Sequence, residues 1–555
     1  MGEYQDAHIS DIVEEINDKY FLPNIQRAFV WKEDQIVRLF DSLLRGYPIG
    51  TFLFWRTKDN NVRRRKFINN YYKKYSKDFN IKKLGLEDTS SRSDIILVLD
   101  GQQRLQSLFI ALKGKYEDKE LYFNVLSGEK ENDDGILYEF KFFKSPPKTT
   151  DKNLWIKVKD IISKFNKKGA LVSDAKKEIL STYGLDSVYE SVIERNLELL
   201  KNALISDRRL SYYDEKEEDY EKVFDIFVRV NSGGTPLSKS DLLFSFIKLK
   251  WKEFEAEKEF PDLLERINGN DQFDFDVDFI LKTSLVLIGS PVRYTVKTFT
   301  GEKGKEIAQN IENNWEDIKS SITTVVDLIR DEFRINNKKL LSSKNALIPV
   351  IYYSHIKNKK SKSSFDDEDK RIIRNWLLNI LLSGTFSGQS DNLLEKARKI
   401  IDNLSPEKFP AKEINSEFPH GKKTEVDEEI IKDISYRSPE SYLLLYLASP
   451  YGIEFKPSND ANYPQQDHIF SQDELKKAGY DKDEINQIGN IRLVPKDANQ
   501  RKLSTPYKDW IKNASSKELE LALIPDKPED WDVDNYKIFV QKREGIILRK
   551  IKEVL

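Results

Sequence analysis

Residues 95–104 read Ile-Ile-Leu-Val-Leu-Asp-Gly-Gln-Gln-Arg, and they set the fold expected for the first part of the chain. The five apolar residues at the start predict a buried strand, which the Asp-Gly pair ends. Apolar residues then recur at helical spacing in Leu105, Leu108, Phe109 and Leu112, which predicts an amphipathic helix. A buried strand that leads directly into a helix indicates an α/β or α+β domain.

The sequence on either side continues this alternation of strand-like and helix-like segments. Residues 36–44 carry apolar side chains along one side of a predicted helix, which ends at Gly46 and Pro48. Residues 50–55 then predict a second buried strand. The first 250 residues are therefore expected to form an α/β domain.

Helical spacing dominates the sequence beyond residue 220. Helices are predicted at 272–289, 305–334, 344–356, 370–384 and 535–555. A loop-rich stretch at 405–440 marks a further boundary. We therefore expect an α+β multidomain protein with domains at 1–250, 251–415 and 416–555, of which the middle one is a helical linker or scaffold.

Length and composition limit what the chain can be. Its 555 residues exceed what one hydrophobic core holds. The absence of cysteine excludes disulfides, thiolate metal sites and cysteine nucleophiles. With 91 basic and 93 acidic residues the chain is nearly neutral, so nucleic-acid binding has to rest on local basic patches. The start lacks a signal-peptide pattern and no apolar run reaches the ~20 residues of a membrane helix, so we expect a soluble cytoplasmic protein without a membrane partner.

One such basic patch is expected at residues 63–66, which read Arg-Arg-Arg-Lys, ahead of the Tyr/Lys-rich residues 71–75. A basic run interleaved with aromatic residues suits a phosphate backbone with stacking bases. Arg63, Arg64 and Arg65 are therefore candidate contacts to DNA phosphates. A solvated loop or helix face is an equally supported interpretation.

The junction at Asp100 is the first candidate site. Phosphates bind where a strand meets a helix, because free backbone N–H groups and the helix dipole face outward there. Arg104 could form a fork with phosphate oxygens, and Asp100 could hold a magnesium ion or a water. The alternative interpretation treats Asp100 as a helix cap and the two glutamines as helix filler. No Walker-type loop is present, so any nucleotide hydrolysis would use a different cradle.

The second candidate site lies near the carboxyl end, where Asp467 and His468 adjoin in a predicted strand. Only four histidines occur in the chain, so this setting is informative. His468 could act as the general base toward a water, and Asp467 could supply a hard oxygen ligand to a Mg²⁺-class ion. Asn490, in a Gly-Asn turn before a partner strand, is expected to hold the hairpin and orient the histidine. Asn499, at the start of a polar helix, would complete the metal site.

The order of these residues along the chain carries more weight than any one of them. A turn dipeptide, a helix cap and a structural histidine would each explain one element alone. Together, a strand with Asp-His, a turn with Asn, a second strand and a helix with Asn favour a ββα-metal nuclease.

Six stretches of sequence, which include the two candidate sites, follow one another along the chain. They are residues 22–31 (Leu-Pro-Asn-Ile-Gln-Arg-Ala-Phe-Val-Trp), 100–104 (Asp-Gly-Gln-Gln-Arg), 227–238 (Phe-Val-Arg-Val-Asn-Ser-Gly-Gly-Thr-Pro-Leu-Ser), 463–470, 488–493 and 499–502. Together they resemble the GmrSD family of restriction enzymes over nearly the whole chain. That resemblance implies a ParB/sulfiredoxin-like amino-terminal domain and a carboxyl-terminal HNH nuclease domain, with the last histidine of HNH replaced by Asn499.

The resemblance also implies roles for particular residues. The nucleotide pocket would be formed by Gln26, Arg27, Asp100, Gly101, Gln102, Gln103, Arg104, Arg229 and Asn231. Asp100 is then the candidate catalytic carboxylate of nucleotide hydrolysis. In the HNH domain Asp467 and Asn499 would be the metal ligands, His468 the base and Asn490 its positioning residue. Lys502 is a candidate phosphate contact.

The expected function is a modification-dependent (type IV) DNA endonuclease used in phage defence. Its expected cofactors are Mg²⁺ or Mn²⁺ and a nucleoside triphosphate (NTP), and its expected partner is modified double-stranded DNA. A homodimer would suit the cutting of both strands, but the sequence leaves the oligomeric state open. Nucleotide binding and hydrolysis by the amino-terminal domain would regulate cutting. Two alternatives stay open: a nucleotide-switched DNA-binding protein that does not cut, and a metal-dependent ribonuclease.

Overall fold

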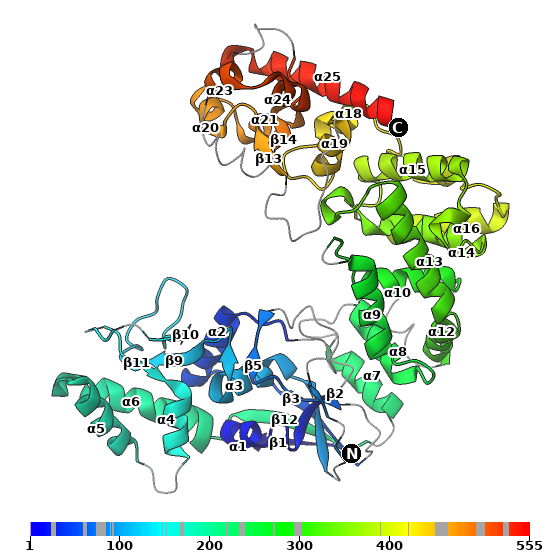
Figure 1. Ribbon diagram of the computed structural model, residues 1–555. Helices are drawn as coiled ribbons and strands as arrows, with labels where there is room; N and C mark the ends of the chain where they lie inside the picture. Colours follow the sequence, from blue (N-terminus) through cyan, green and yellow to red (C-terminus); the bar gives the residue numbers. More distant parts are fainter. Residues whose placement is uncertain are drawn as a thin grey trace. The chain divides into compact units, whose positions relative to one another are not determined.

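The computed structural model describes residues 2–555 apart from 24–28, 59–63, 74–84, 89, 92–93, 147, 151, 167–170, 218–219, 232–238, 270–271, 294–301, 389, 420, 450–463, 495–505 and 526–531. The chain forms two compact units (Figure 1). The first comprises Met1–Pro261 with Val296–Lys305, and the second comprises Asp262–Thr295 with Glu306–Leu555.

A mixed sheet forms the centre of the first unit. Its strands are β1 (Glu3–Ala7), β12 (Leu210–Glu215), β3 (Phe52–Thr57), β7 (Ile95–Asp100), β2 (Tyr20–Pro23), β4 (Arg64–Arg65) and β6 (Glu87–Asp88), in that order across the sheet. β7 pairs antiparallel with β3 and parallel with β2, so it lies in the interior of the sheet. β12 enters beside β3 although it is far away in sequence, and pairs with it in parallel.

The predicted strand at residues 95–99 is confirmed as β7, and its five apolar residues are at most 1% exposed. The predicted helix that follows is α3 (Gln102–Lys113), whose Leu105, Leu108 and Ile110 are fully buried. The helix predicted at 36–44 lies within α2 (Glu33–Leu44), and the strand predicted at 50–55 overlaps β3.

Further helices and two small sheets complete the first unit. The helices are α1 (Ile9–Glu14), α4 (Val158–Phe165), α5 (Val172–Tyr183), α6 (Glu190–Lys201), α7 (Tyr220–Asn231) and α8 (Lys239–Lys250), with the short turns η2 (Ser187–Tyr189) and η3 (Asn202–Ser206). One small sheet has the order β10 (Phe140–Phe143), β9 (Glu120–Asn124), β11 (Trp155–Lys157), and the other pairs β5 (Asn70–Tyr71) with β8 (Lys115–Tyr116). α9 (Ala256–Asn268) and α12 (Glu302–Asn313) cross the borders between the units.

The second unit is mainly helical. Its helices are α10 (Val277–Leu287), α13 (Trp315–Asp327), α14 (Ile348–Ile356), α15 (Asp367–Leu382), α16 (Ser390–Leu404), α17 (Ala411–Ser416), α18 (Glu428–Asp433), α19 (Ser441–Ala448), α20 (Gln472–Lys477), α21 (Lys482–Ile485), α23 (Tyr507–Asn513), α24 (Ser516–Leu521) and α25 (Tyr536–Val554). Short turns are η4 (Leu328–Glu332), η5 (Lys338–Leu340), η6 (Lys344–Leu347), η7 (Lys362–Ser364), η8 (Ile488–Asn490) and η10 (Val533–Asn535). The described strands here are β13 (Gln465–His468) and β14 (Ile491–Val494).

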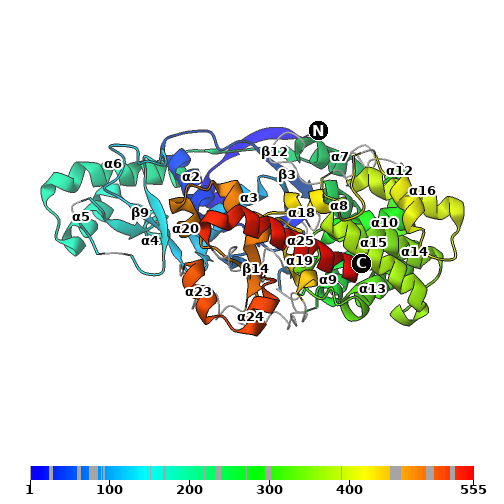
Figure 2. The same cartoon turned by 90° about the horizontal axis from the view of Figure 1, so that it is seen from above.

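α14 is the centre of the helical part because it is apolar on all sides. Ile348, Val350, Ile351 and Tyr353 are fully buried, and the helix contacts α10, α13 and α16. Nearer the carboxyl end, α25 packs on α18, α19 and η8 and so joins these elements (Figure 2). The expected class, a sheet-containing amino-terminal region followed by a helical remainder, is confirmed. Among the described helices, none has the length and apolar character that crossing a bilayer requires.

Gly101 offers a test of how tightly the turn between β7 and α3 is built. Its φ of 84° is left-handed, and an added Cβ would lie 2.3 Å from the Phe52 ring. Gly101→Ala should therefore lower the free energy of unfolding by about 2–4 kcal/mol, from backbone strain and overpacking together. Urea unfolding followed by circular dichroism measures this loss.

Gly135→Ala is the matched control for this prediction. Gly135 also has a left-handed φ, of 74°, but an added Cβ would meet no atom within 4 Å. That variant should lose only the backbone term of about 1–2 kcal/mol. Equal losses in the two variants would contradict the predicted role of the Phe52 contact.

Candidate functional site

The predicted nuclease residues lie on a two-stranded antiparallel hairpin in the second unit. β13 pairs with β14 so that Asp467 stands opposite Arg492 and His468 opposite Ile491. Asp467 and His468 are 9% and 7% exposed, so both side chains sit at a nearly closed surface. Neighbouring strand residues project to opposite faces, which gives the carboxylate and the imidazole different surroundings.

The carboxylate of Asp467 forms an ion pair across the hairpin. Its Oδ2 accepts from Nε of Arg492 at 3.1 Å and lies 3.0 Å from Nη2 of the same side chain. The Arg492 guanidinium also lies over the Trp510 ring, 4.0 Å from its centroid. Burial lowers the pKa of Arg492, and the neighbouring Asp467 carboxylate opposes that shift. Arg492 therefore fixes where the Asp467 oxygens point.

The imidazole of His468 is held by side chains outside the hairpin. Its Nε2 hydrogen-bonds to Oδ1 of Asn486 at 3.0 Å. Because an amide oxygen only accepts, the ring donates from Nε2 and keeps its lone pair on Nδ1. The amide nitrogen of Gln472 lies 3.5 Å from both ring nitrogens, and the ring of Tyr436 packs on the imidazole at a centroid distance of 4.5 Å. This orientation leaves Nδ1 as the basic atom.

The side chain of Asn490 is fully buried and binds backbone on two segments. Its Oδ1 accepts from Phe470 N–H at 2.9 Å. Its amide group donates to the carbonyls of Ile485 at 3.0 Å and Phe470 at 3.3 Å. The residue thus ties the end of β13 to the turn that precedes β14. Its bonds reach the backbone two residues beyond His468 and do not reach the imidazole itself.

Arg543 on α25 supports the same turn from the other side. It is 1% exposed and donates to the carbonyls of Ala522, Ile488 and Gly489 at 2.8, 3.1 and 3.0 Å. Burial is the main cause that lowers its pKa, to about 9. The backbone of α25 comes so close that an added Cβ on Gly489 would lie 2.6 Å from the Val540 carbonyl oxygen. The Gly-Asn pair is therefore needed for this close packing as well as for the turn.

Two predicted residues of this site, Asn499 and Lys502, lie outside the described residues. Among the residues that the structure describes, no group of three or more His, Asp or Glu side chains that could hold a metal ion lies together. Asp467 supplies one hard oxygen ligand, which suits an ion that keeps most of its coordinated waters. The roles of Asn499 and Lys502 stay predictions.

The predicted nucleotide site begins at the end of β7 in the first unit. Asp100 is the last residue of the strand, and Gly101 caps α3, so the alternative of Asp100 as the cap is not supported. Nη2 of Arg104 lies 3.2 Å from the Asp100 carboxylate, and its guanidinium also donates to the carbonyls of Ile49 and Thr51 at 2.5 and 3.1 Å. Several N–H groups of Arg104 are therefore hydrogen-bonded to the loop before β3.

The two glutamines of this motif are buried, and Gln103 is more than helix filler. Gln102 is 8% exposed and Gln103 is 9% exposed. Oε1 of Gln103 accepts from Val30 N–H at 3.0 Å, which ties α3 to the segment after β2. The predicted pocket residues Gln26 and Arg27 belong to that segment but lie outside the described residues. The bond from Gln103 thus brings two of the predicted motifs together.

The third motif reaches the same strand through α7, which contacts β7. Arg229 and Asn231 lie in the last turn of that helix, and Arg229 is exposed. The Gly-Gly turn that follows is outside the described residues. The structure therefore places α7 against the strand that ends at Asp100.

The basic run at residues 63–66 does not form an exposed face where the structure describes it. Arg64 and Arg65 make up β4 and are 3% and 6% exposed. Arg64 lies 4.0 Å from the Asp88 carboxylate and over the Phe21 ring. This burial argues against the expected phosphate contacts, because a cation inside a sheet cannot reach a DNA backbone. Arg63 lies outside the described residues.

Sequence reasoning missed three residues that shape these sites. Arg492 could have been found from the register, since it stands opposite Asp467 in the predicted hairpin. Asn486 lies outside every motif, so nothing local marks it as the partner of His468. Gln106, one turn after Gln102, pairs with both the N–H and the carbonyl of Ile68. A buried glutamine on an apolar helix face was the available signal.

Two comparisons with known proteins bear on this arrangement. Residues 9–248 match the family model described as GmrSD restriction endonuclease, N-terminal domain. An uncharacterized protein of Methanocaldococcus jannaschii is 23% identical to this chain in an alignment that spans 96% of each. The family match supports the GmrSD type predicted from the sequence, and with it an endonuclease role of restriction type. The hairpin of β13 and β14 lies outside the matched residues.

Replacing Asn490 tests how much the hairpin depends on it. Asn490→Ala should lower the free energy of unfolding by about 2–4 kcal/mol, since it leaves a buried N–H and two buried carbonyls without their partner. Asn513→Ala is the control, because Asn513 is exposed and makes one bond to a carbonyl in its own helix. That variant should change stability by no more than about 0.5 kcal/mol. Thermal unfolding compares them, and a loss below that of Asn513→Ala would refute the role of Asn490.

Proposed function

We propose that this chain is a modification-dependent DNA endonuclease of the type IV restriction class, whose second unit carries an HNH site of the ββα-metal type. The observation that carries the proposal is the hairpin in which Asp467 and His468 adjoin and a buried Asn490 locks the following turn. The family match supports it, since the GmrSD model describes a restriction endonuclease. The order strand, turn and strand is the frame that this class of nuclease needs.

His468 would act as the general base. Its Nε2 is committed to Asn486, so the lone pair on Nδ1 would accept the proton of the attacking water. Gln472, which approaches Nδ1, would have to give way to that water or hold it in place. Tyr436 and Asn486 would keep the ring from rotating, so the base would stay aimed while the substrate moves into position.

Asp467 and Asn499 would hold the divalent ion. When bound, a Mg²⁺-class ion supplies positive charge against the scissile phosphate and the leaving oxygen. Arg492 would keep the Asp467 carboxylate in one orientation and balance its charge while the site is being loaded. Lys502 would contact a phosphate of the substrate strand.

The first unit would bind a nucleoside triphosphate and regulate cutting. Asp100 at the end of β7, the αL turn at Gly101 and the amino end of α3 would place a carboxylate beside the backbone N–H groups of the first helical turn. Arg104 would shape this cradle by holding the loop before β3, as much as by contacting phosphate. Because an unregulated nuclease harms its host, a nucleotide-dependent switch would suit this role, and a homodimer would allow both strands of modified DNA to be cut.

The nuclease proposal is tested by His468→Ala. Removing the base should lower cleavage of modified phage DNA, with Mg²⁺ or Mn²⁺ present, by at least about a hundredfold. DNA binding and nucleotide hydrolysis should remain. Cleavage is followed on gels with matched unmodified DNA and RNA, each with and without NTP.

His355→Ala is the control for that experiment. His355 is a half-buried histidine of the same unit, hydrogen-bonded to Ser321 and away from the hairpin. It should cut as the unchanged chain does. Equal cutting by His468→Ala would refute the site, cutting of RNA alone would identify a ribonuclease, and binding of DNA without cutting would identify a nucleotide-switched DNA-binding protein.

The nucleotide proposal is tested by Asp100→Asn, which keeps the shape of the side chain and removes its charge. Hydrolysis of ATP or GTP, measured as phosphate release, should fall by at least about tenfold, because a neutral amide is a much poorer ligand for a magnesium ion. Asp174→Asn, at an exposed position in the first turn of α5, should hydrolyse nucleotide at the unchanged rate. Undiminished hydrolysis by Asp100→Asn would place the nucleotide chemistry elsewhere.

A further inference from the structure

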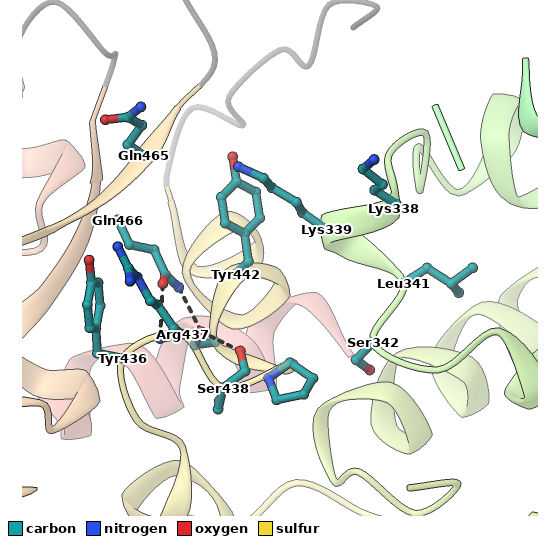
Figure 3. Close-up of a pocket in the computed structure, with 12 residues that line it drawn as sticks. Lys338, Lys339, Leu341, Ser342, Tyr436, Arg437, Ser438, Tyr442, Gln465 and Gln466 are labelled. Carbon is teal, nitrogen blue, oxygen red and sulfur yellow. Dashed lines mark hydrogen bonds between the residues drawn. The ribbon is translucent and has the colours of Figure 1, made fainter. Parts of the chain in front are cut away.

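A pocket of about 580 Å³ opens beside the hairpin, within the second unit (Figure 3). Three segments form its walls: η5 with the residues up to Ser342, the stretch from Tyr436 to Tyr442, and Gln465 and Gln466 at the start of β13. Its volume lies within the roughly 300–1,000 Å³ range of pockets that bind small molecules or parts of larger ones.

The charge of the pocket is one-sided. Lys338, Lys339 and Arg437 line it, and none of the twelve described residues in its walls is acidic. All three cationic side chains are exposed, so they can meet a ligand from solution. The ammonium group of Lys339 is partly buried over the Tyr442 ring, and this partial burial and the nearby Lys338 lower the pKa of Lys339. An anion placed between the two lysines would relieve their repulsion.

Polar groups without charge complete the wall. Oε1 of Gln466 accepts from the Arg437 N–H at 3.1 Å, and its amide donates to the Ser441 hydroxyl at 2.7 Å (Figure 3). These bonds hold the Arg437 backbone, whose φ of 65° is left-handed, against β13. The Ser438 hydroxyl is buried and finds no hydrogen-bond partner among the described residues. Cations and hydroxyl donors are what phosphate oxygens bind.

The pocket connects directly to the proposed base. Tyr436 lines it and packs on the His468 ring at 4.5 Å, while the Arg437 guanidinium lies 4.9 Å from the centroid of the same tyrosine. Gln466, which is hydrogen-bonded to the Arg437 backbone, is two residues before His468 on the same strand. A chain of phosphates that passes through the pocket would therefore lead to the imidazole.

We propose that this pocket binds the sugar-phosphate backbone of the substrate strand next to the scissile phosphate, through Lys338, Lys339 and Arg437. The inference rests on the proposed nuclease function, which it deepens by assigning the path of the strand. The contacts are to phosphates, so binding here is independent of base sequence and falls as salt rises.

The test measures how DNA binding depends on salt. The full chain carries His468→Ala so that the duplex stays intact, and its Kd for a short labelled duplex is measured over a series of KCl concentrations. The variant Lys338→Gln/Lys339→Gln/Arg437→Gln is compared with Arg371→Gln/Lys399→Gln/Lys412→Gln, which removes three exposed cations elsewhere in the same unit. Both sets remove the same net charge.

The pocket variant should reduce the slope of log Kd against log salt by about 2 to 3, since each lost phosphate contact removes about 0.9. It should also weaken binding at least about tenfold, while the control set changes the slope by less than about 1. Should the triple variant fold poorly in thermal unfolding, the single Lys338→Glu at an exposed position replaces it, with an expected slope change of about 1. An unchanged slope, or an equal loss in both sets, overturns the proposal.

Cleavage by the chain with His468 present separates this inference from the proposed function. Cutting of the duplex combined with an unchanged slope would overturn the pocket alone. If the pocket variant reduces the slope of log Kd against log salt but the chain cuts no DNA or RNA, the proposed nuclease function is refuted. The pocket would then remain a strand-binding site.

Discussion

The amide of Asn490 is the contact on which the candidate nuclease site depends. It satisfies the N–H and carbonyl of Phe470 and the carbonyl of Ile485, so one side chain joins the end of β13 to the turn that leads into β14. Because these backbone groups are buried, water would not reach them if the Asn490 amide were removed, and each would then lack a hydrogen-bond partner at a cost in stability. This joint lies next to the hairpin in which Asp467 stands opposite Arg492. The strand with the two candidate side chains, Asp467 and His468, is thereby anchored by an uncharged residue that bonds to neither of them.

The two units use buried polar side chains in the same way. In the first unit Gln103 binds the backbone at Val30 and Gln106 binds the backbone at Ile68, so two glutamines on one helix hold two separate loops. In the second unit Asn490 binds the backbone at Phe470 and Ile485. Arg543 binds the carbonyls of Ile488 and Gly489. Amide and guanidinium groups suit this task because they present several donors or acceptors in a fixed geometry. Several loops beside the candidate sites are therefore attached to their neighbouring helices through side-chain bonds to their backbone.

Sequence patterns predicted those helices and strands that depend on residues close together in the sequence. The apolar run of β7, the helical spacing of α3 and the closing helix at α25 each follow from a few neighbouring residues. The place of β12 between β1 and β3 did not follow, because pairing between distant strands leaves no local mark. The same limit applied to Asn486, which supports His468 from outside every motif. The run of arginines was misleading for another reason: two of them are buried in a short strand, whereas charge runs are usually solvated.

The packing of α25 on the turn at Gly489 has a consequence for the order in which the protein can mature. The strand with Asp467 and His468 is synthesised well before residues 536–554. The carbonyls of Ile488 and Gly489 nevertheless accept hydrogen bonds from Arg543, which lies on that later helix. A ribosome makes the chain from its amino end, so the hairpin gains its final support only after the last helix has emerged. The first unit, which has its own core, can fold during that interval. The regulatory part of the proposed enzyme would thus be in place before its cutting part.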